Sequence, residues 1–206
     1  MQKVYEFIEK CCREQGIDDS HGLIHSKHTV EWAELLMDSL NVYEDERKFV
    51  MYGAALHDMC DSKYIEVKKG QAIIYQWLLD TGWEPDVANA LIQVIGSTSY
   101  TKLKQARIKG EIVYPTHGKW QKAYHIIRHA DLLDAYKVER CMLYNMHIHP
   151  EMASEEAWKV VSTLFENRVF NYVSEGWLFY PKALELVPDL EKKAREDIKN
   201  SGFVYI

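Results

Sequence analysis

Apolar residues recur at three- and four-residue spacing along most of the chain, which is the pattern of amphipathic helices. This period predicts helices over residues 3–14, 25–41, 44–60, 65–80, 85–97, 119–146, 154–175 and 182–199. Strand-like alternation is scarce, and only residues 111–114 are expected to be briefly extended. Residues 97–118 lack a helical period, and so long a loop in a compact domain often forms a lid or a binding segment. The pattern therefore predicts an all-α fold, a compact helical bundle.

The length of 206 residues suits one sizeable domain. We expect a single helical domain over 1–206, in which the aromatic-rich helices of residues 147–206 pack back onto the bundle. Apolar residues make up 47% and charged residues 27%, proportions that exclude a mostly disordered chain. The sequence leaves the oligomeric state open.

Charge and targeting signals narrow the class of protein further. The net charge of −6 argues against a general nucleic-acid coat. No apolar run approaches the roughly 18 residues that a membrane helix needs, and the first residues hold no apolar signal core. The four cysteines show no CxxC spacing. We therefore expect a cytoplasmic protein with reduced thiols and with neither membrane nor nucleic acid as a partner.

Metal-capable residues interrupt the apolar inner faces of three predicted helices. His57 shares the inner face of its helix, and Asp58 follows it at the buried end. Asp131 interrupts the inward stripe of the helix over 119–146, and His25 lies in the first turn of another helix. A buried carboxylate without a partner costs several kcal/mol, so it must be paired, protonated or bound to a metal.

Two imidazoles and two carboxylates suit one divalent ion such as Mn²⁺, Fe²⁺ or Mg²⁺, with coordination positions open to water or substrate. A closed structural zinc site would instead use thiolates and leave no open position. A lone histidine on a helix face, or one His-Asp dipeptide, is more often structural than a ligand. The constellation on three inner faces nevertheless favours a metal site at His25, His57, Asp58 and Asp131.

Three segments of the sequence match the motifs of a known family. They read Asp19-Ser20-His21…His25-Ser26-Lys27-His28-Thr29, Ala54-Ala55-Leu56-His57-Asp58-Met59-Cys60-Asp61-Ser62-Lys63-Tyr64 and Ala130-Asp131-Leu132-Leu133-Asp134-Ala135. The chain thereby resembles the HD superfamily of metal-dependent phosphohydrolases, and it looks most like the small bacterial branch of nucleotide pyrophosphohydrolase-like proteins. The resemblance implies an HD-domain helical bundle, and it maps the four metal ligands of the family onto His25, His57, Asp58 and Asp131.

The chain departs from this branch around the expected metal site rather than within it. His28 and Thr29 stand where the branch has Arg and Val, and His129 replaces a common Asp. Residues 136–140 replace a Gly-rich continuation. These differences bear on the substrate more than on the chemistry.

Asp61, Lys63 and His21 are candidates for the catalytic machinery. The family pattern favours Asp61 as the group that orients or deprotonates the attacking water, although the local sequence suits a turn cap equally well. Lys63 directly follows the helix that carries His57 and Asp58 and is the best candidate for a phosphate contact. His21 could contact phosphate, shift protons, or simply lie exposed in its loop.

Lys63, together with Lys102 and Lys104 from the loop over 97–118, is expected to bind the departing phosphates of a substrate. A leaving pyrophosphate carries several negative charges, so it needs cationic contacts beyond the metal. Arg140 is excluded from the predicted site, because on a continuous helix it would face away from Asp131.

The leading hypothesis is a metal-dependent phosphohydrolase acting on a small-molecule phosphate ester. The resemblance favours conversion of a nucleoside triphosphate to the monophosphate and pyrophosphate, with Mn²⁺ preferred over Mg²⁺, Fe²⁺, Co²⁺ or Ni²⁺. A nucleoside monophosphate phosphatase or phosphodiesterase of the HD type is the first alternative. A non-catalytic metal- or nucleotide-binding HD protein is another. A di-iron oxygenase of the HD type would need two further histidines between His57 and Asp131, where only His117, His125 and His129 are available.

Overall fold

The computed structural model describes residues 1–201, and the regular secondary structure within that range is helical. Its α-helices are α1 (Gln2–Gln15), α2 (Leu23–Ser39), α3 (Glu44–Leu56), α4 (Val67–Asp80), α5 (Pro85–Ile95), α6 (Tyr100–Gln105), α7 (Gln121–Asp134), α8 (Val138–Ile148), α9 (Ser154–Asn167) and α10 (Pro181–Asn200). Two 3₁₀ turns, η1 (Gly118–Trp120) and η2 (Val169–Asn171), complete the set. The described residues contain no strand, so the all-α prediction is confirmed.

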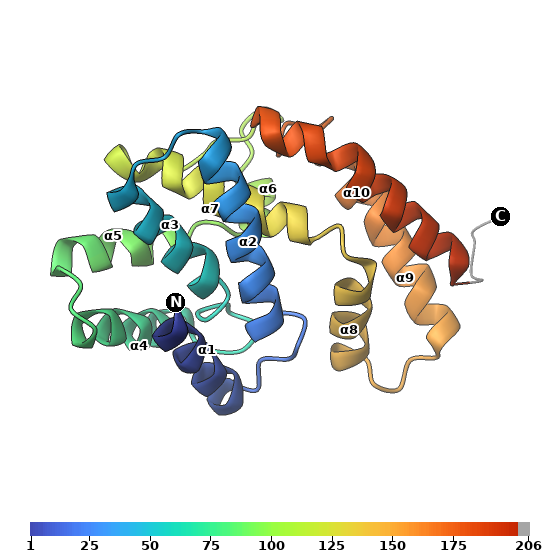
Figure 1. Cartoon of the computed structure of the whole chain (residues 1–206). Helices are drawn as coiled ribbons and strands as arrows, with labels where there is room; N and C mark the ends of the chain where they lie inside the picture. The colour runs from blue at the N-terminus through green and yellow to red at the C-terminus, as the bar shows by residue number, and fades with distance from the viewer. Residues whose placement is uncertain (202–206) are drawn as a thin grey trace.

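Helices α2, α3 and α7 pack on one another and form the centre of the molecule (Figure 1). Small residues make the close approach between α3 and α7 possible. A Cβ atom added at Gly53 of α3 would clash with Cδ1 of Ile127 on α7 and would lie 3.2 Å from Leu91 Cδ1. The fully buried Ala54 and Ala55 continue this small-residue surface toward the end of α3. The sequence of α3 therefore brings its C-terminal end close to α7.

The remaining helices surround this centre on two sides. Helices α1 and α5 contact α3, and α4 packs against α5. On the other side, α8 and α9 pack together, and α10 contacts α2, α7 and α8 (Figure 1). The buried apolar residues form one cluster from Val4 to Ala194. Of the segment 147–206 expected to pack back onto the bundle, residues 202–206 lie outside the described residues.

The helix predicted over 119–146 is wrong as a single element. It is two helices, α7 and α8, joined by residues 135–137. Neither Gly nor Pro marks this joint, so the sequence gives none of the usual signals of a break. Tertiary contacts hold it instead: Tyr136 is buried, and Lys137 has an extended backbone with its Nζ 2.7 Å from Asp134 Oδ1. The break turns α8 away from the axis of α7.

Three other boundaries differ from the prediction. The segment over 97–118 contains α6, six residues anchored by the buried Tyr100 and Leu103 and too short to show a period. The helix predicted over 154–175 ends at Asn167, where Arg168 leaves the helical conformation. The helix predicted over 44–60 ends at Leu56 and continues as a turn. Residues 111–114 form no strand, and only an isolated bridge joins Ile108 to Glu111.

Among the helices of residues 1–201, none combines the length and the apolar character that a membrane crossing requires.

The contact between Gly53 and Ile127 gives a stability test. Gly53→Ala should lower the free energy of unfolding by about 1 kcal/mol, because overpacking of about 1–3 kcal/mol outweighs the gain in helix propensity. Ile127→Val alone should also be destabilising, by about 0.5–1.5 kcal/mol. In the Gly53→Ala background, however, Ile127→Val should restore stability, since it removes the clashing Cδ1 atom. Urea unfolding of the four proteins measures this coupling, and strict additivity would contradict it.

Candidate metal centre

The four predicted ligands come together where α2 begins and where α3 and α7 end. His25 lies in the first turn of α2, and Asp131 lies in the last turn of α7. Helix α3 ends at Leu56, so His57 and Asp58 follow it directly. Both histidines and Asp58 are buried. The packing of the three central helices therefore brings the two motif histidines and both aspartates to one place.

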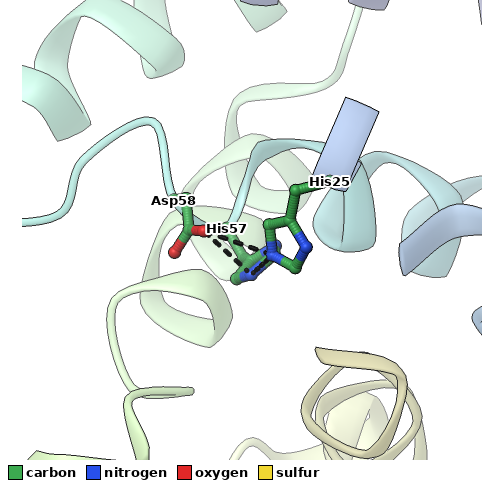
Figure 2. Close-up of side chains that lie close together, drawn as sticks. All are labelled: His25, His57 and Asp58. Carbon is green, nitrogen blue, oxygen red and sulfur yellow. Dashed lines mark hydrogen bonds and ion pairs between the residues drawn. The ribbon is translucent and has the colours of Figure 1, made fainter. Parts of the chain in front are cut away.

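The distances between the ligand atoms are short and uniform. The Nε2 atoms of His25 and His57 are 3.3 Å apart, and Asp58 Oδ2 lies 3.3 and 3.5 Å from them respectively. Asp131 Oδ1 lies 3.5 Å from each Nε2 atom. Figure 2 shows His25, His57 and Asp58 turned toward one point. These three residues form a group whose ligand atoms all lie within 4.8 Å of one another, and Asp131 approaches it from α7.

Hydrogen bonds at the far side of each ring fix which nitrogen faces this point. His25 Nδ1 lies 2.7 Å from Asp134 Oδ2, and His57 Nδ1 lies 2.8 Å from the Ala54 carbonyl oxygen. A carbonyl and an ionised carboxylate only accept hydrogen bonds, so both Nδ1 atoms donate. In the neutral rings, each Nε2 then carries a lone pair directed at the other ligand atoms.

The cluster is strongly electron-rich and requires a positive charge. Burial raises the pKa of Asp58 and of Asp131, but the adjacent histidines outweigh it and hold both carboxyls well below their usual range. Burial and Arg140 lower the pKa of His25, yet Asp131, Asp134 and Asp58 outweigh them and raise it to about 10. A cation, either a proton or a metal ion, is therefore stabilised among these four side chains.

The donor set fits a divalent ion. Atoms bound to one ion at about 2.1 Å are about 3.0–3.4 Å apart in octahedral or tetrahedral arrangements, close to the separations seen here. The buried Asp58 Oδ2 accepts no hydrogen bond, although it lies within ion-pair distance of the histidines. The histidine side chains are almost inaccessible, whereas Asp131 is 22% exposed, so the cluster opens on its carboxylate side.

The open side faces a pocket of about 600 Å³, a volume typical of small-molecule sites. The cluster residues His57, Asp58 and Asp131 form part of its lining. Four cationic side chains, contributed by separate segments, also line it: Lys63, Lys102, Arg140 and Arg168. The pocket therefore combines a candidate metal centre with several groups that attract anions.

Asp61 and Lys63 lie in the turn that follows the His57-Asp58 pair. Asp61 Oδ1 accepts a hydrogen bond from the Lys63 backbone N–H at 2.9 Å, which is the turn-capping contact expected from the sequence. Its other oxygen, Oδ2, lies 3.5 Å from Lys63 Nζ. Both side chains line the pocket. The capping role of Asp61 is thus present, and its second oxygen lies beside a pocket cation.

His21 is buried at the rim of the pocket and belongs to a hydrogen-bond network. Its Nε2 lies 3.0 Å from Lys63 Nζ, which only donates, so Nε2 accepts. Its Nδ1 lies 2.7 Å from Ser20 Oγ and 3.0 Å from the Tyr64 hydroxyl, and that hydroxyl donates to Asp18. Burial lowers the pKa of His21. The structure therefore places a neutral imidazole next to Lys63, which excludes an exposed loop histidine.

Two of the predicted substrate-binding lysines differ in position. Lys102 lines the pocket from α6. Lys104 is exposed and lies over the ring of Tyr100, 5.6 Å from its centroid, outside the pocket lining. The structure thus brings Lys102 to the candidate site and leaves Lys104 beside it.

The exclusion of Arg140 from the site is wrong. Arg140 Nη2 lies 3.6 Å from Asp131 Oδ1, Nη1 lies 3.9 Å from Asp134 Oδ2, and Nε donates to the Ser20 carbonyl at 2.8 Å. The exclusion assumed one continuous helix, and the break at residues 135–137 turns Arg140 back toward the ligands.

Asp134 and Asp18 also have roles that sequence reasoning missed. Asp134 is fully buried, supports His25, and is bound by Lys137 and Arg140. Burial raises its pKa, but His25 and Arg140 outweigh this and hold the pKa at about 2. Its position one helical turn after Asp131 was the available signal. Asp18, rather than the motif residue Asp19, accepts the hydrogen bonds of the network around His21.

The other histidines lie away from the cluster. His129 is fully buried, and its Nε2 accepts the Phe179 backbone N–H at 3.0 Å. His125 contacts Gln121, and His117 contacts Ser97. None of these three lines the pocket. His28 lies 3.7 Å from Asp134, behind His25.

Comparisons with known proteins support the fold. No family model matches the chain, and no curated protein matches it. A solved structure from Lactobacillus plantarum resembles it with a TM-score of 0.71 at 15% identity, covering 97% of this chain and 93% of that one. YpgQ from Bacillus subtilis resembles it with a TM-score of 0.67 at 14% identity, covering 97% and 91%. At these identities the likeness shows the fold alone.

The ligand assignment predicts metal loss on substitution. His57→Ala and Asp58→Ala should each abolish binding of a divalent ion, because each removes one of the converging atoms. Helical content should stay unchanged, since the core is apolar. Asp38→Ala, which removes an exposed carboxylate paired with Arg47, is the matched control and should bind metal normally. Metal content by mass spectrometry and circular dichroism measure the two properties. Full metal occupancy in Asp58→Ala would refute the assignment.

The support of His25 by Asp134 predicts a graded effect. Asp134→Asn retains an acceptor for His25 Nδ1 but removes the charge, so metal affinity should fall about 10- to 100-fold. Calorimetric titration with Mn²⁺ measures this change. An unchanged affinity would show that Asp134 only fills the core.

Proposed function

We propose that this chain is a metal-dependent phosphohydrolase of the HD superfamily that acts on a nucleotide-like small molecule. The observation that carries the proposal is the meeting of four electron-rich ligand atoms beside a pocket that is also lined by cations. The preferred reaction converts a nucleoside triphosphate to the monophosphate and pyrophosphate. We propose Mn²⁺ as the ion, with Mg²⁺, Fe²⁺, Co²⁺ or Ni²⁺ as alternatives, and a cytoplasmic location.

The arrangement suits phosphate esters for an electrostatic reason. A phosphate resists attack because its negative charge repels the nucleophile. A divalent ion held by His25, His57, Asp58 and Asp131 would supply charge neutralisation and acidify bound water. Lys63, Lys102 and Arg140 lie in the same pocket and stabilise negative charge on phosphoryl oxygens.

Asp61 is the acid–base group of this proposal, and His21 positions Lys63. One carboxylate oxygen of Asp61 accepts the backbone hydrogen bond that caps the turn. The other oxygen is the one that orients or deprotonates a water molecule in the pocket. His21 is neutral and accepts from Lys63, so it holds the lysine ammonium at the wall of the pocket. Lys63 thereby presents its charge to a departing phosphate.

The first alternative, a monophosphate phosphatase or phosphodiesterase of the HD type, uses the same centre and differs only in the substrate. A non-catalytic metal- or nucleotide-binding protein is the other alternative. The di-iron oxygenase is disfavoured, because His117, His125 and His129 all lie outside the pocket lining.

A nucleotide panel tests the proposal. Nucleoside mono-, di- and triphosphates and a cyclic dinucleotide are incubated with the protein and Mn²⁺, Mg²⁺, Co²⁺ or Ni²⁺, and the products are separated by ion-exchange chromatography. Turnover that disappears in Asp58→Ala supports a hydrolase. The absence of turnover with every substrate and metal would leave the non-catalytic alternative.

Asp61 can be separated from the metal ligands by substitution. Asp61→Asn preserves the acceptor that caps the turn, so folding and metal content should be unchanged. Turnover should fall about 10²- to 10⁴-fold, the range for loss of an acid–base group. Steady-state kinetics at equal metal occupancy measure the effect. Unchanged turnover would show that Asp61 only caps the turn.

The products identify the bond that is cut. We expect pyrophosphate together with the nucleoside monophosphate, and Lys63→Ala should reduce triphosphate turnover while leaving metal content unchanged. Release of orthophosphate and diphosphate, or activity confined to monophosphates, would contradict the triphosphate reaction while leaving the broader phosphohydrolase proposal intact.

A further inference from the structure

Two cations of the pocket, Lys102 and Arg168, form no ion pair with a carboxylate among residues 1–201, and of these Lys102 is exposed whereas Arg168 is half-buried. Lys63 lies beside Asp61, and Arg140 lies beside Asp131 and Asp134. Among residues 1–201, no ion pair joins the Arg168 guanidinium to an acidic side chain, although the side chain lines the pocket. A half-buried guanidinium without a counter-ion in a ligand-sized pocket attracts an anion.

The surroundings of Arg168 hold its guanidinium in one orientation. Its Nε donates to the Tyr172 hydroxyl at 2.9 Å, and its Cζ lies 4.1 Å from the centroid of the Tyr100 ring. Both tyrosines are buried. An arginine has five N–H donors, so the bond from Nε leaves the four on Nη1 and Nη2 for a ligand. Arg168 is therefore pre-organised, with the paired donors that bind phosphate oxygens in parallel.

Arg168 and Arg140 lie on different segments and line the same pocket, together with Cys141, the residue that follows Arg140. Arg140 contacts the metal-ligand Asp131, whereas Arg168 contacts Tyr100 of α6 and Tyr172 after η2. Arg140 is thus the guanidinium in contact with a candidate metal ligand, and Arg168 is the one whose contacts are with tyrosines.

We infer that Arg168 binds the terminal phosphate of a triphosphate chain and makes the pocket select triphosphates over monophosphates. This inference rests on the proposed function for the position of the first phosphate at the metal centre. A bound divalent ion would offset the charges of Asp58 and Asp131, and Asp61 would then be the remaining carboxylate of the pocket lining, against Lys63, Lys102, Arg140 and Arg168. That excess of positive charge suits a polyanion longer than one phosphate group.

A purely structural role for Arg168 makes a different prediction. Its stacking on Tyr100 and its bond to Tyr172 join α6 to the segment after α9, so its loss could simply loosen the pocket. A looser pocket would bind every anion more weakly, by a similar factor. If Arg168 instead binds the terminal phosphate, its loss would lower the affinity for the longer anion only.

Arg195 provides a matched control. Its guanidinium also stacks on an aromatic ring, with Cζ 3.8 Å from the Phe170 centroid, but it is paired with Glu166 and Glu191. It lines a separate groove on the outer face of α10. Arg195→Gln therefore removes a stacked guanidinium of the same kind without changing the pocket.

The experiment measures binding of inorganic tripolyphosphate and of orthophosphate by calorimetry to the full chain at matched metal content. Arg168→Gln should bind tripolyphosphate about 10- to 100-fold more weakly than the unsubstituted protein, the range for a lost charge-assisted pair. Orthophosphate affinity should change less than about threefold, because the pair is absent from that complex. Arg168→Lys should give an intermediate loss, and Arg195→Gln should change neither affinity. Thermal unfolding of each variant reports on the structural role.

Three results would overturn the inference. These are undetectable tripolyphosphate binding by the unsubstituted protein, equal tripolyphosphate affinity in Arg168→Gln, and an equal loss for both anions. The readout does not depend on turnover. If the nucleotide panel shows no hydrolysis while Arg168→Gln selectively loses tripolyphosphate, the proposed function fails and the anion site stands. If the panel shows hydrolysis while Arg168→Gln binds tripolyphosphate normally, the proposed function stands and Arg168 has no part in substrate binding.

Discussion

The repulsion among two imidazole lone pairs and two carboxylates, packed at 3.3–3.5 Å in the interior, is the constraint on which this structure depends. Such a cluster is stable only with a cation at its centre and with neighbours that hold each group in place. Asp134 and the Ala54 carbonyl hold the two rings from behind. The small residues of α3 allow the helices to come close enough for the ligand atoms to meet. The apolar packing of the three central helices thus positions a polar site.

Charge is arranged in layers around this cluster. Asp134 lies behind His25, and Lys137 and Arg140 lie beside Asp134, so negative and positive groups alternate outward from the ligands. On the open side, four cationic side chains, Lys63, Lys102, Arg140 and Arg168, line the pocket together with the carboxylates of Asp58, Asp61 and Asp131. An anion in the pocket therefore lies among positive as well as negative groups. The net charge of −6 for the whole chain conceals this local group of cations.

The sequence predicted site residues whose signal is local, and it failed for residues whose position depends on tertiary contacts. His25, His57 and Asp131 each stand out as polar residues on an apolar helix face, Asp58 follows His57 directly, and all four meet in the structure. Arg140 was missed because its position depends on a helix break without Gly or Pro, held by the burial of Tyr136. Arg168 was not assigned to the site for a related reason. The apolar period predicted a helix that continues past Asn167, whereas the helix ends there and the orientation of the Arg168 side chain is set by tyrosines from α6 and from the segment after η2.

The origin of the ligands on three helices also has a consequence for the mechanics of the fold. His25 and His57 are separated by 32 residues, and His25 and its support Asp134 by 109. An ion bound to this cluster would therefore act as a cross-link that joins the start of α2 to the ends of α3 and α7. Closing loops of this size opposes folding through chain entropy, and an ion that binds only the closed form offsets that opposition by mass action. Metal depletion would then release the junction of α2, α3 and α7 while each helix keeps its own hydrogen bonds.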